Sequence, residues 1–229
     1  MSLLSAIVTD TGPDPKSSII WLHGLGASGH DFASMPQELD LQDCGAIRFI
    51  FPHAPVMPVT LNNGMPMRSW YDIAELSPHA REDEKGLRAS QKLVEDLIEA
   101  EKARGVPANR IVLAGFSQGC AMTLQAGLRH GETLAGLMCL SGYVPINATL
   151  AAERHAANQN TPIFMAHGVY DPIIQFPRAT QSRDLLTGLG YHVEWQQYPM
   201  EHSVSEEEVR HIGTWLRKVL ANPAKPANQ

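Results

Sequence analysis

The stretch "IVLAGFSQGCAM", residues 111–122, decides the fold of this chain. It begins as an apolar strand, turns at "GFSQG" (115–119), and continues into "CAMTLQAGLRH" (120–130), which is rich in small residues and typical of a helix. A serine between two glycines at such a junction is the pattern of a nucleophile elbow, a sharp turn that lifts the serine out at the carboxyl edge of a sheet. The alternative is a serine that caps a helix after a strand.

Outward from this stretch, apolar runs alternate with helical patterns. The runs that we interpret as strands are 17–22, 46–51, 110–115, 134–140, 161–166 and 191–198. The middle four are nearly continuous, as strands buried on both faces must be. Strands that alternate with helices imply a mostly parallel central sheet with helices on both faces. We therefore expect one α/β domain over residues 1–229, with no separate cap domain and with a flexible tail at 221–229.

Two long helices are predicted from their apolar faces. Within residues 79–104, Leu87, Val94, Leu97 and Ile98 fall on one face, and charged side chains occupy the rest. Near the C-terminus, Ser205 and Glu208 have capping-box spacing ahead of an apolar stripe that ends at Val219.

The composition excludes several classes of protein. The 229 residues are 44% hydrophobic and 18% charged with a net charge of −6, so there is no basic surplus for nucleic acid. The N-terminal apolar stretch breaks at Asp10, and no run is long enough for stable membrane insertion. The three cysteines, Cys44, Cys120 and Cys139, have no metal-like spacing and cannot all form disulfides with one another. We expect a soluble, cytoplasmic protein.

A serine nucleophile needs a base and an acid, which follow it in the order Asp or Glu, then His, in a hydrolase sheet. Asp171 comes just after the run 161–166, and His202 comes after the run 191–198, so both lie at carboxyl ends of strands. We therefore predict a triad of Ser117, Asp171 and His202. The alternatives are a turn-forming Asp-Pro and a solvated loop histidine; His167 is a rival base, but it is expected to shape the Asp171 turn.

A second glycine pattern competes with this interpretation. The stretch "HGLGASG" (23–29) has the G-x-G-x-x-G spacing of a dinucleotide-binding oxidoreductase and follows a strand. That fold also needs an acid at the end of the next strand, and here the chain reads Phe-Pro-His at 51–53. In a hydrolase, the same loop would supply an oxyanion-hole amide at Leu25, beside the amide of Gln118.

Six ordered motifs resemble those of the carboxylesterase and acyl-protein thioesterase family of α/β-hydrolases, also called the phospholipase/carboxylesterase family. The resemblance extends from about residue 17 to residue 220, and its motifs are "LHGLGASGHDF", "FPHAP", "RSWYDI", "GFSQG", "HGVYDPII" and "EHSV". It implies the α/β-hydrolase fold and hydrolysis of acyl esters or thioesters by Ser117, Asp171 and His202. Leu25 and Gln118 would be the oxyanion donors, and neither a metal nor a cofactor is expected.

The sequence predicts the type of reaction more specifically than it predicts the substrate. We expect a carboxylesterase that acts on short to medium acyl chains, with acyl-protein thioesterase or lysophospholipase as alternatives. The substrate would be a small molecule or an acylated partner. Members of the family often form weak homodimers, so a weak homodimer is an open expectation for this chain.

The acyl pocket is predicted from one long loop. Residues 52–80 carry five prolines and several soft apolar side chains, and loops of this length are uncommon without a function. In the resembling family this region contributes to the acyl-binding channel, which makes Met65, Trp70 and Leu76 candidates for its lining. The alternative for Trp70 is that it packs into the core.

Overall fold

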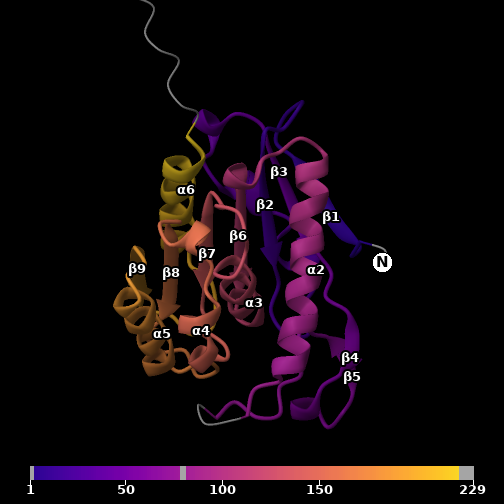
Figure 1. The fold of residues 1–229 in the computed structure, drawn as a ribbon, viewed down its shortest axis with the longest axis vertical. Helices are drawn as coiled ribbons and strands as arrows, with labels where there is room; N and C mark the ends of the chain where they lie inside the picture. Colours follow the sequence, from indigo (N-terminus) through magenta and orange to yellow (C-terminus); the bar gives the residue numbers. More distant parts are fainter. Residues whose placement is uncertain (1–2, 78–80, 222–229) are drawn as a thin grey trace, which may run out of the picture.

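The computed structural model describes residues 3–77 and 81–221 and shows a seven-stranded sheet flanked by helices (Figure 1). The strand order is β1-β3-β2-β6-β7-β8-β9, and a separate hairpin pairs β4 with β5. The strands are β1 (Ala6–Asp10), β2 (Ser17–Leu22), β3 (Ile47–Pro52), β4 (Val56–Pro58), β5 (Pro66–Arg68), β6 (Ile111–Phe116), β7 (Gly136–Leu140), β8 (Ile163–Gly168) and β9 (Val193–Tyr198). Only β1 runs antiparallel within the described part of the main sheet. The predicted mostly parallel sheet is confirmed.

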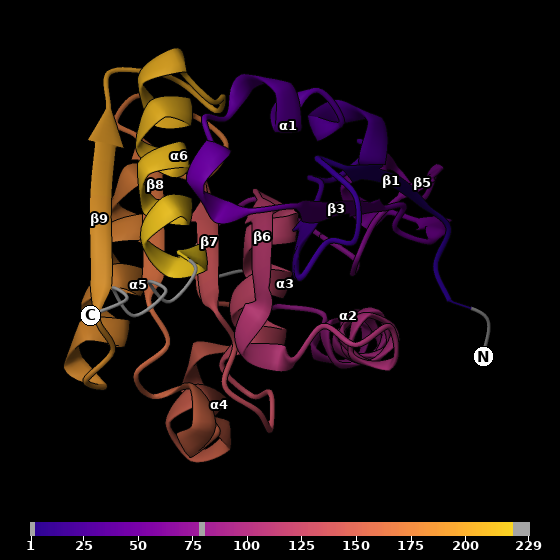
Figure 2. The same cartoon turned by 90° about the horizontal axis from the view of Figure 1, so that it is seen from above.

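Helices cover both faces of this sheet, as predicted. The helices are α1 (Met35–Glu38), α2 (Glu84–Ala103), α3 (Gln118–Gly127), α4 (Asn147–Glu153), α5 (Phe176–Gly188) and α6 (Glu206–Leu220), with short 3-10 turns at Gly29–Phe32, Gln42–Cys44, Thr60–Asn62, Ala108–Arg110 and Ala156–Asn158. Figure 2 shows α1 and α6 on one side of the sheet and α2, α3 and α4 on the other. Each side buries its own hydrophobic cluster, with Leu97 of α2 in one and Trp215 of α6 in the other.

All six predicted strands are present, with ends that differ from the expected ones by at most two residues. The missed strands have weak signals for a physical reason. β1 is a half-exposed strand at the sheet edge, so it has no continuous apolar run. β4 and β5 have three residues each, and each includes a proline, which cannot donate a backbone hydrogen bond to a ladder.

The two predicted long helices are also present, with differences at their starts. α2 begins at Glu84 because the Asp83 side chain caps it by accepting a hydrogen bond from the Gly86 amide. α6 begins after Ser205, whose Oγ accepts from the Glu208 amide at 3.2 Å. The other half of the expected capping box is not formed, since the Glu208 carboxylate makes no hydrogen bond among the described residues. Apart from Ala221, the expected tail lies outside the described residues.

The parallel strands bring the loops that follow β2, β6, β8 and β9 to one edge of the sheet, because parallel strands end at the same edge. These loops carry the four segments that the sequence singles out, namely 23–29, 115–119, 171 and 202. Within residues 3–77 and 81–221, no helix has the length and apolar character needed to cross a membrane.

Candidate active site

Ser117 lies in a sharp turn between β6 and α3, with φ at 56° in the left-handed region. The flanking glycines are required by the close approach of strand and helix. A Cβ on Gly115 would lie 2.1 Å from the Gly119 carbonyl oxygen, and one on Gly119 would lie 2.1 Å from the Leu22 carbonyl oxygen. The Ser117 amide donates to the Leu140 carbonyl at 2.9 Å, which ties the turn to β7. The turn has the geometry of a nucleophile elbow.

Ser117, His202 and Asp171 form a continuous hydrogen-bond chain. His202 Nε2 lies 2.9 Å from Ser117 Oγ, and His202 Nδ1 lies 2.7 Å from Asp171 Oδ2. An ionised carboxylate can only accept, so Nδ1 carries the proton and Nε2 is left to accept from the serine hydroxyl. The Asp171 side chain is fully buried, whereas 17% of the His202 side chain is exposed. The histidine therefore reaches solvent while its carboxylate partner does not.

Hydrogen bonds hold the Asp171 carboxylate in place. Its Oδ1 accepts from the amides of Ile173 and Ile174 at 2.8 and 2.9 Å. Burial alone would raise the pKa of Asp171, but the hydrogen bonds from His202 and from the two amides outweigh it and hold the pKa below its ordinary value. Asp171 is thus ionised at neutral pH and suited to stabilise a charged imidazole.

His167, the rival histidine, has a structural position. Its Nε2 donates to the Ile174 carbonyl oxygen at 2.7 Å, and burial lowers its pKa, so it is held neutral. It fixes the turn that carries Asp171, as the sequence predicts.

The loops that carry Asp171 and His202 are tied to each other. Tyr170 donates its amide to the Met200 carbonyl at 3.1 Å, and Val169 donates to the Tyr198 carbonyl at 2.9 Å. Gly168 allows this approach, because a Cβ there would lie 2.3 Å from the Met200 carbonyl oxygen. The spacing between the acid and the base is thus set by backbone contacts between β8 and β9.

The Leu25 and Gln118 amides are available to bind an anion beside Ser117. The Leu25 loop passes close to the serine, since a Cβ on Gly24 would lie 3.4 Å from Ser117 Cβ. Neither amide donates a hydrogen bond among the residues that the structure describes. Both residues line the same cavity as Ser117. Two N–H groups that are not bonded to other protein groups, next to a nucleophile, are the requirement for an oxyanion hole.

The Gln118 side chain has a role that sequence reasoning missed. Its Oε1 accepts from the Trp70 amide at 2.9 Å, and its Nε2 donates to the Tyr71 carbonyl at 2.7 Å. These bonds fasten the segment before α2, which contains Trp70 and Tyr71, to the elbow at Ser117. The groups that bind the Gln118 side chain are mostly backbone atoms 47 and 48 residues away in the sequence, so no local sequence pattern predicts these hydrogen bonds.

Two cavities meet at Ser117. A narrow cavity of about 70 Å³ extends along the segment before α2, and a wider cleft of about 510 Å³ extends along His202. They share the lining residues Leu25, Leu76, Ser117 and Ile173. The predicted candidate Leu76 therefore lies where the two cavities join.

The other two predicted lining residues lie elsewhere, and the expected acyl wall is corrected accordingly. Trp70 is 1% exposed and packs in the core, where its indole N–H donates to the His23 carbonyl at 2.9 Å. Met65 is 57% exposed, beside Gly64, in the connection between β4 and β5. Neither residue lines the narrow cavity or the wide cleft. Within the predicted loop, the part that lines the narrow cavity is Tyr71–Leu76.

The glycine pattern at 23–29 serves local packing. A Cβ on Gly29 would lie 2.2 Å from the Phe51 carbonyl oxygen, and Gly26 has φ at 74°. His23 Nδ1 donates to the Gly24 carbonyl at 2.7 Å, and its Nε2 accepts from the Ala54 amide at 3.0 Å. His23 is therefore structural, as predicted for the hydrolase interpretation.

One cluster of possible metal ligands occurs among the described residues, formed by Glu99, His130 and Glu132. The Lys102 ammonium already lies between its carboxylates, 2.7 Å from Glu99 and in contact with Glu132. An ion-pair network accounts for this cluster, and it shares no residue with the two cavities at Ser117.

Comparison with known proteins places this geometry in context. The sequence profile of the family described as Phospholipase/Carboxylesterase matches residues 4–220. An acyl-protein thioesterase 1 of Yarrowia lipolytica is 44% identical over 207 residues, which cover 88% of this chain and 91% of that protein. One of Neurospora crassa is 41% identical over 222 residues, covering 93% of this chain and 91% of that protein.

Solved structures agree with the sequence comparison. The crystal structure of Arabidopsis thaliana SOBER1 is 32% identical to this chain, with a TM-score of 0.85, covering 89% of this chain and 99% of that one. That of Zea mays acyl-protein thioesterase 2 is 29% identical, with a TM-score of 0.82, covering 94% and 100% of the two chains.

Proposed function

The chain belongs to the phospholipase/carboxylesterase family, and from this premise we propose that Ser117, His202 and Asp171 are its catalytic triad. The protein is a serine hydrolase of the α/β-hydrolase fold. The observation that supports the triad most is the hydrogen-bond chain from Ser117 Oγ through His202 to Asp171, at 2.9 and 2.7 Å. Membership of a hydrolase family also leaves no ground for interpreting the 23–29 loop as a dinucleotide site.

Acylation uses each of these groups in turn. His202 Nε2 takes the proton from Ser117 as Oγ attacks the acyl carbonyl carbon, and Asp171 stabilises the resulting imidazolium. The amides of Leu25 and Gln118 bind the oxygen that becomes negatively charged. His202 then gives its proton to the leaving oxygen or sulfur atom, and the acyl group stays on Ser117.

Deacylation reverses the roles with water as the nucleophile. His202 takes a proton from a water molecule that attacks the acyl-enzyme carbonyl, and the same two amides bind the oxyanion. His202 returns the proton to Ser117 Oγ as the carboxylic acid leaves. The exposed edge of His202 suits this step, because water reaches the ring from the wide cleft.

The two cavities fit two different parts of the substrate. The leaving group must lie near His202 Nε2, which protonates it, and His202 lines the wide cleft but not the narrow cavity. The acyl chain therefore occupies the narrow cavity, between Leu76 and Ile173. An open cleft on the leaving-group side accommodates a large alcohol or thiol.

We assign the chain to the hydrolysis of short to medium acyl esters, because the acyl side is narrow. A second candidate, supported by the wide leaving-group cleft and by relatives named acyl-protein thioesterase 1, is the hydrolysis of acyl thioesters on proteins. Both reactions use the same triad and differ only in the leaving group.

One comparison tests this assignment. The butanoyl group is presented as an oxygen ester, as a small thioester and as a thioester on a cysteine peptide, and kcat/KM is measured for each. We expect all three to be hydrolysed, and none by Ser117→Ala. A preference of tenfold or more for the peptide thioester would favour the thioesterase, and hydrolysis by Ser117→Ala would contradict the triad.

A further inference from the structure

The narrow cavity changes character along its length. Leu25, Leu76 and Ile173 line both this cavity and the cleft at Ser117, so the end of the cavity at Ser117 has these apolar side chains in its lining. The lining also includes Tyr143, Glu82 and Arg178, which come from three different segments of the chain and which we call the end wall. An acyl pocket that is apolar throughout would gain affinity with each added methylene, whereas a charged end wall removes that gain.

The end wall is held by its own contacts. The Glu82 carboxylate accepts from the Ile146 amide at 2.6 Å and pairs with Arg178 at 3.2 Å. The Arg178 guanidinium lies over the Tyr143 ring, 3.4 Å from its centroid, and the Tyr143 and Tyr71 hydroxyls are 3.0 Å apart. Since the ion pair links the segment before α2 to α5, neither side chain moves away without losing a charged partner.

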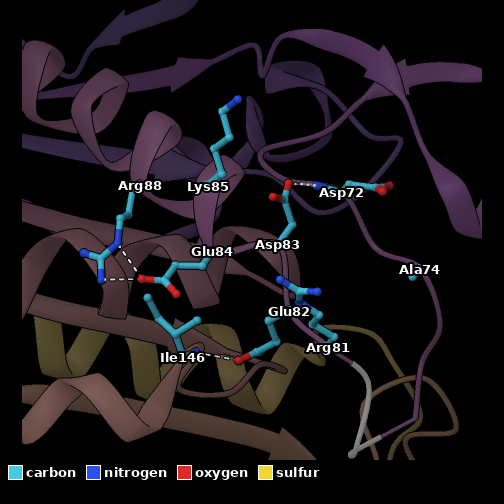
Figure 3. A pocket seen from close by; sticks show the side chains of 9 residues that line it. All are labelled: Asp72, Ala74, Arg81, Glu82, Asp83, Glu84, Lys85, Arg88 and Ile146. Atoms are coloured by element: carbon cyan, nitrogen blue, oxygen red, sulfur yellow. Dashed lines mark hydrogen bonds and ion pairs between the residues drawn. The ribbon is translucent and has the colours of Figure 1, made fainter.

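On its far side, the end wall faces a second space. This space is an open cavity of about 850 Å³ lined by charged side chains. Figure 3 shows these side chains, with Glu82 bound to Ile146 and with Arg81 beside it. This polar cavity and the narrow cavity share the lining residues Asp72, Ala74, Arg81 and Glu82. The two spaces therefore lie back to back, and the Glu82 side chain lies between them.

The geometry points to the Glu82–Arg178 ion pair as the group that sets the upper limit of acyl-chain length. This inference rests on the proposed function, since it assumes that the acyl group enters the narrow cavity. The cavity is small, about 70 Å³ against roughly 30 Å³ for one water molecule in the liquid, so it holds only a short acyl chain. A longer chain would place methylenes against a hydrogen-bonded ion pair and would desolvate it without replacing its water.

The unmutated protein provides the first test. With p-nitrophenyl esters from acetate to decanoate, kcat/KM should rise over the shortest chains and then fall before decanoate. A continuous rise to decanoate would overturn the inference without the use of any variant.

A double variant provides the second test. Glu82→Ala/Arg178→Ala removes both charges together, so neither charge is left without its ion-pair partner, while the Ile146 amide loses its acceptor. The shorter side chains enlarge the space at the end wall. We expect the ratio of kcat/KM for decanoate to that for butanoate to rise by about tenfold or more, since each accommodated methylene is worth roughly fourfold. Acetate serves as the reference substrate for this variant, because an acetyl group does not reach the end wall.

The control variant is Glu194→Ala/Lys218→Ala, which removes an ion pair of similar length, 3.3 Å, that shares no residue with either cavity at Ser117. It should leave the decanoate ratio unchanged. Thermal unfolding verifies that each variant is folded. If the folded double variant hydrolyses acetate but keeps the same decanoate-to-butanoate ratio of kcat/KM, the end wall does not limit chain length. If Ser117→Ala hydrolyses acetate, the proposed function itself is wrong.

Discussion

At the scale of single residues, Asp171 determines what His202 can do. Its carboxylate accepts the Nδ1 proton at 2.7 Å and so leaves Nε2 without a proton, facing Ser117 Oγ. The carboxylate is fixed in turn by the Ile173 and Ile174 amides. A side chain of the same shape but with N–H donors would favour the opposite tautomer of the histidine, with its proton directed at the serine.

We therefore expect Asp171→Asn to fold with a nearly unchanged Tm and to lose about 10⁴-fold in kcat on p-nitrophenyl acetate, the loss seen when the corresponding aspartate of another triad enzyme is replaced. Stopped-flow or steady-state hydrolysis measures the loss, and calorimetry measures Tm. A folded variant that keeps more than about a tenth of the activity would show that Asp171 does not orient His202.

The residues that the sequence could predict are those whose position follows from the order of strands. Ser117, Asp171 and His202 each lie just beyond a strand end, and parallel strands bring their carboxyl ends together. Met65 and Trp70 are predicted from the composition of a loop and from the family resemblance, neither of which determines which side chains face inward. Glu82 and Arg178 could not be predicted, because their 96-residue separation gives no local pattern.

At the scale of elements, the start of α6 combines a normal cap with an unusual buried acid. Ser205 caps the helix by accepting from the Glu208 amide, but the Glu208 side chain is fully buried and its carboxylate has no hydrogen bond among the described residues. Burial raises the pKa of Glu208 from 4.5 to about 8. The side chain is therefore protonated at neutral pH in the folded protein and ionised in the unfolded chain.

This difference makes stability depend on pH with a defined sign. Below about pH 4.5 Glu208 is neutral in both states and has no effect; between 4.5 and 8 only the unfolded chain loses the proton, so stability falls as pH rises. A pKa raised to about 8 corresponds to a loss of roughly a few kcal/mol. Glu208→Gln stays neutral at every pH, so we expect it to be increasingly more stable than the unmutated protein from pH 5 to pH 8 in urea unfolding.

The matched control for this measurement is Glu207→Gln, which removes an exposed carboxylate from the same helical turn. It should follow the unmutated protein across the pH range. If the stability of Glu208→Gln also runs parallel to that of the unmutated protein between pH 5 and 8, Glu208 is ionised in the folded state and its burial has no such consequence.

Helices and strands are predicted well from the sequence where burial imposes a regular spacing of apolar residues, and poorly where it does not. The β6 strand and the apolar faces of α2 and α6 are fixed by burial, and their patterns are visible in the sequence. β1 is stabilised by pairing at a sheet edge, and the β4–β5 hairpin by three paired positions. Backbone pairing of this kind leaves little trace in the residue types.

At the scale of the whole molecule, the fold places one nucleophile between two spaces of different size. The sheet edge brings Ser117, the Leu25 loop and His202 together, and the segment before α2 closes the acyl side while the cleft along His202 stays wide. Gln118 links these parts, because it belongs to the elbow and also binds the Trp70 amide and Tyr71 carbonyl. The division between acyl and leaving-group sides thus depends on the tertiary arrangement, which the strand and helix pattern alone does not determine.

The central claim is that Ser117 is the nucleophile of this hydrolase, and covalent labelling tests it most directly. The protein is treated with a fluorophosphonate, digested and mapped by mass spectrometry, in parallel with Ser117→Ala. We expect one label per chain, on the peptide that contains Ser117, and loss of ester hydrolysis in step with labelling. Ser117→Ala should have an unchanged Tm and show neither labelling nor hydrolysis. A label on another residue, or hydrolysis that persists in folded Ser117→Ala, would contradict the central claim.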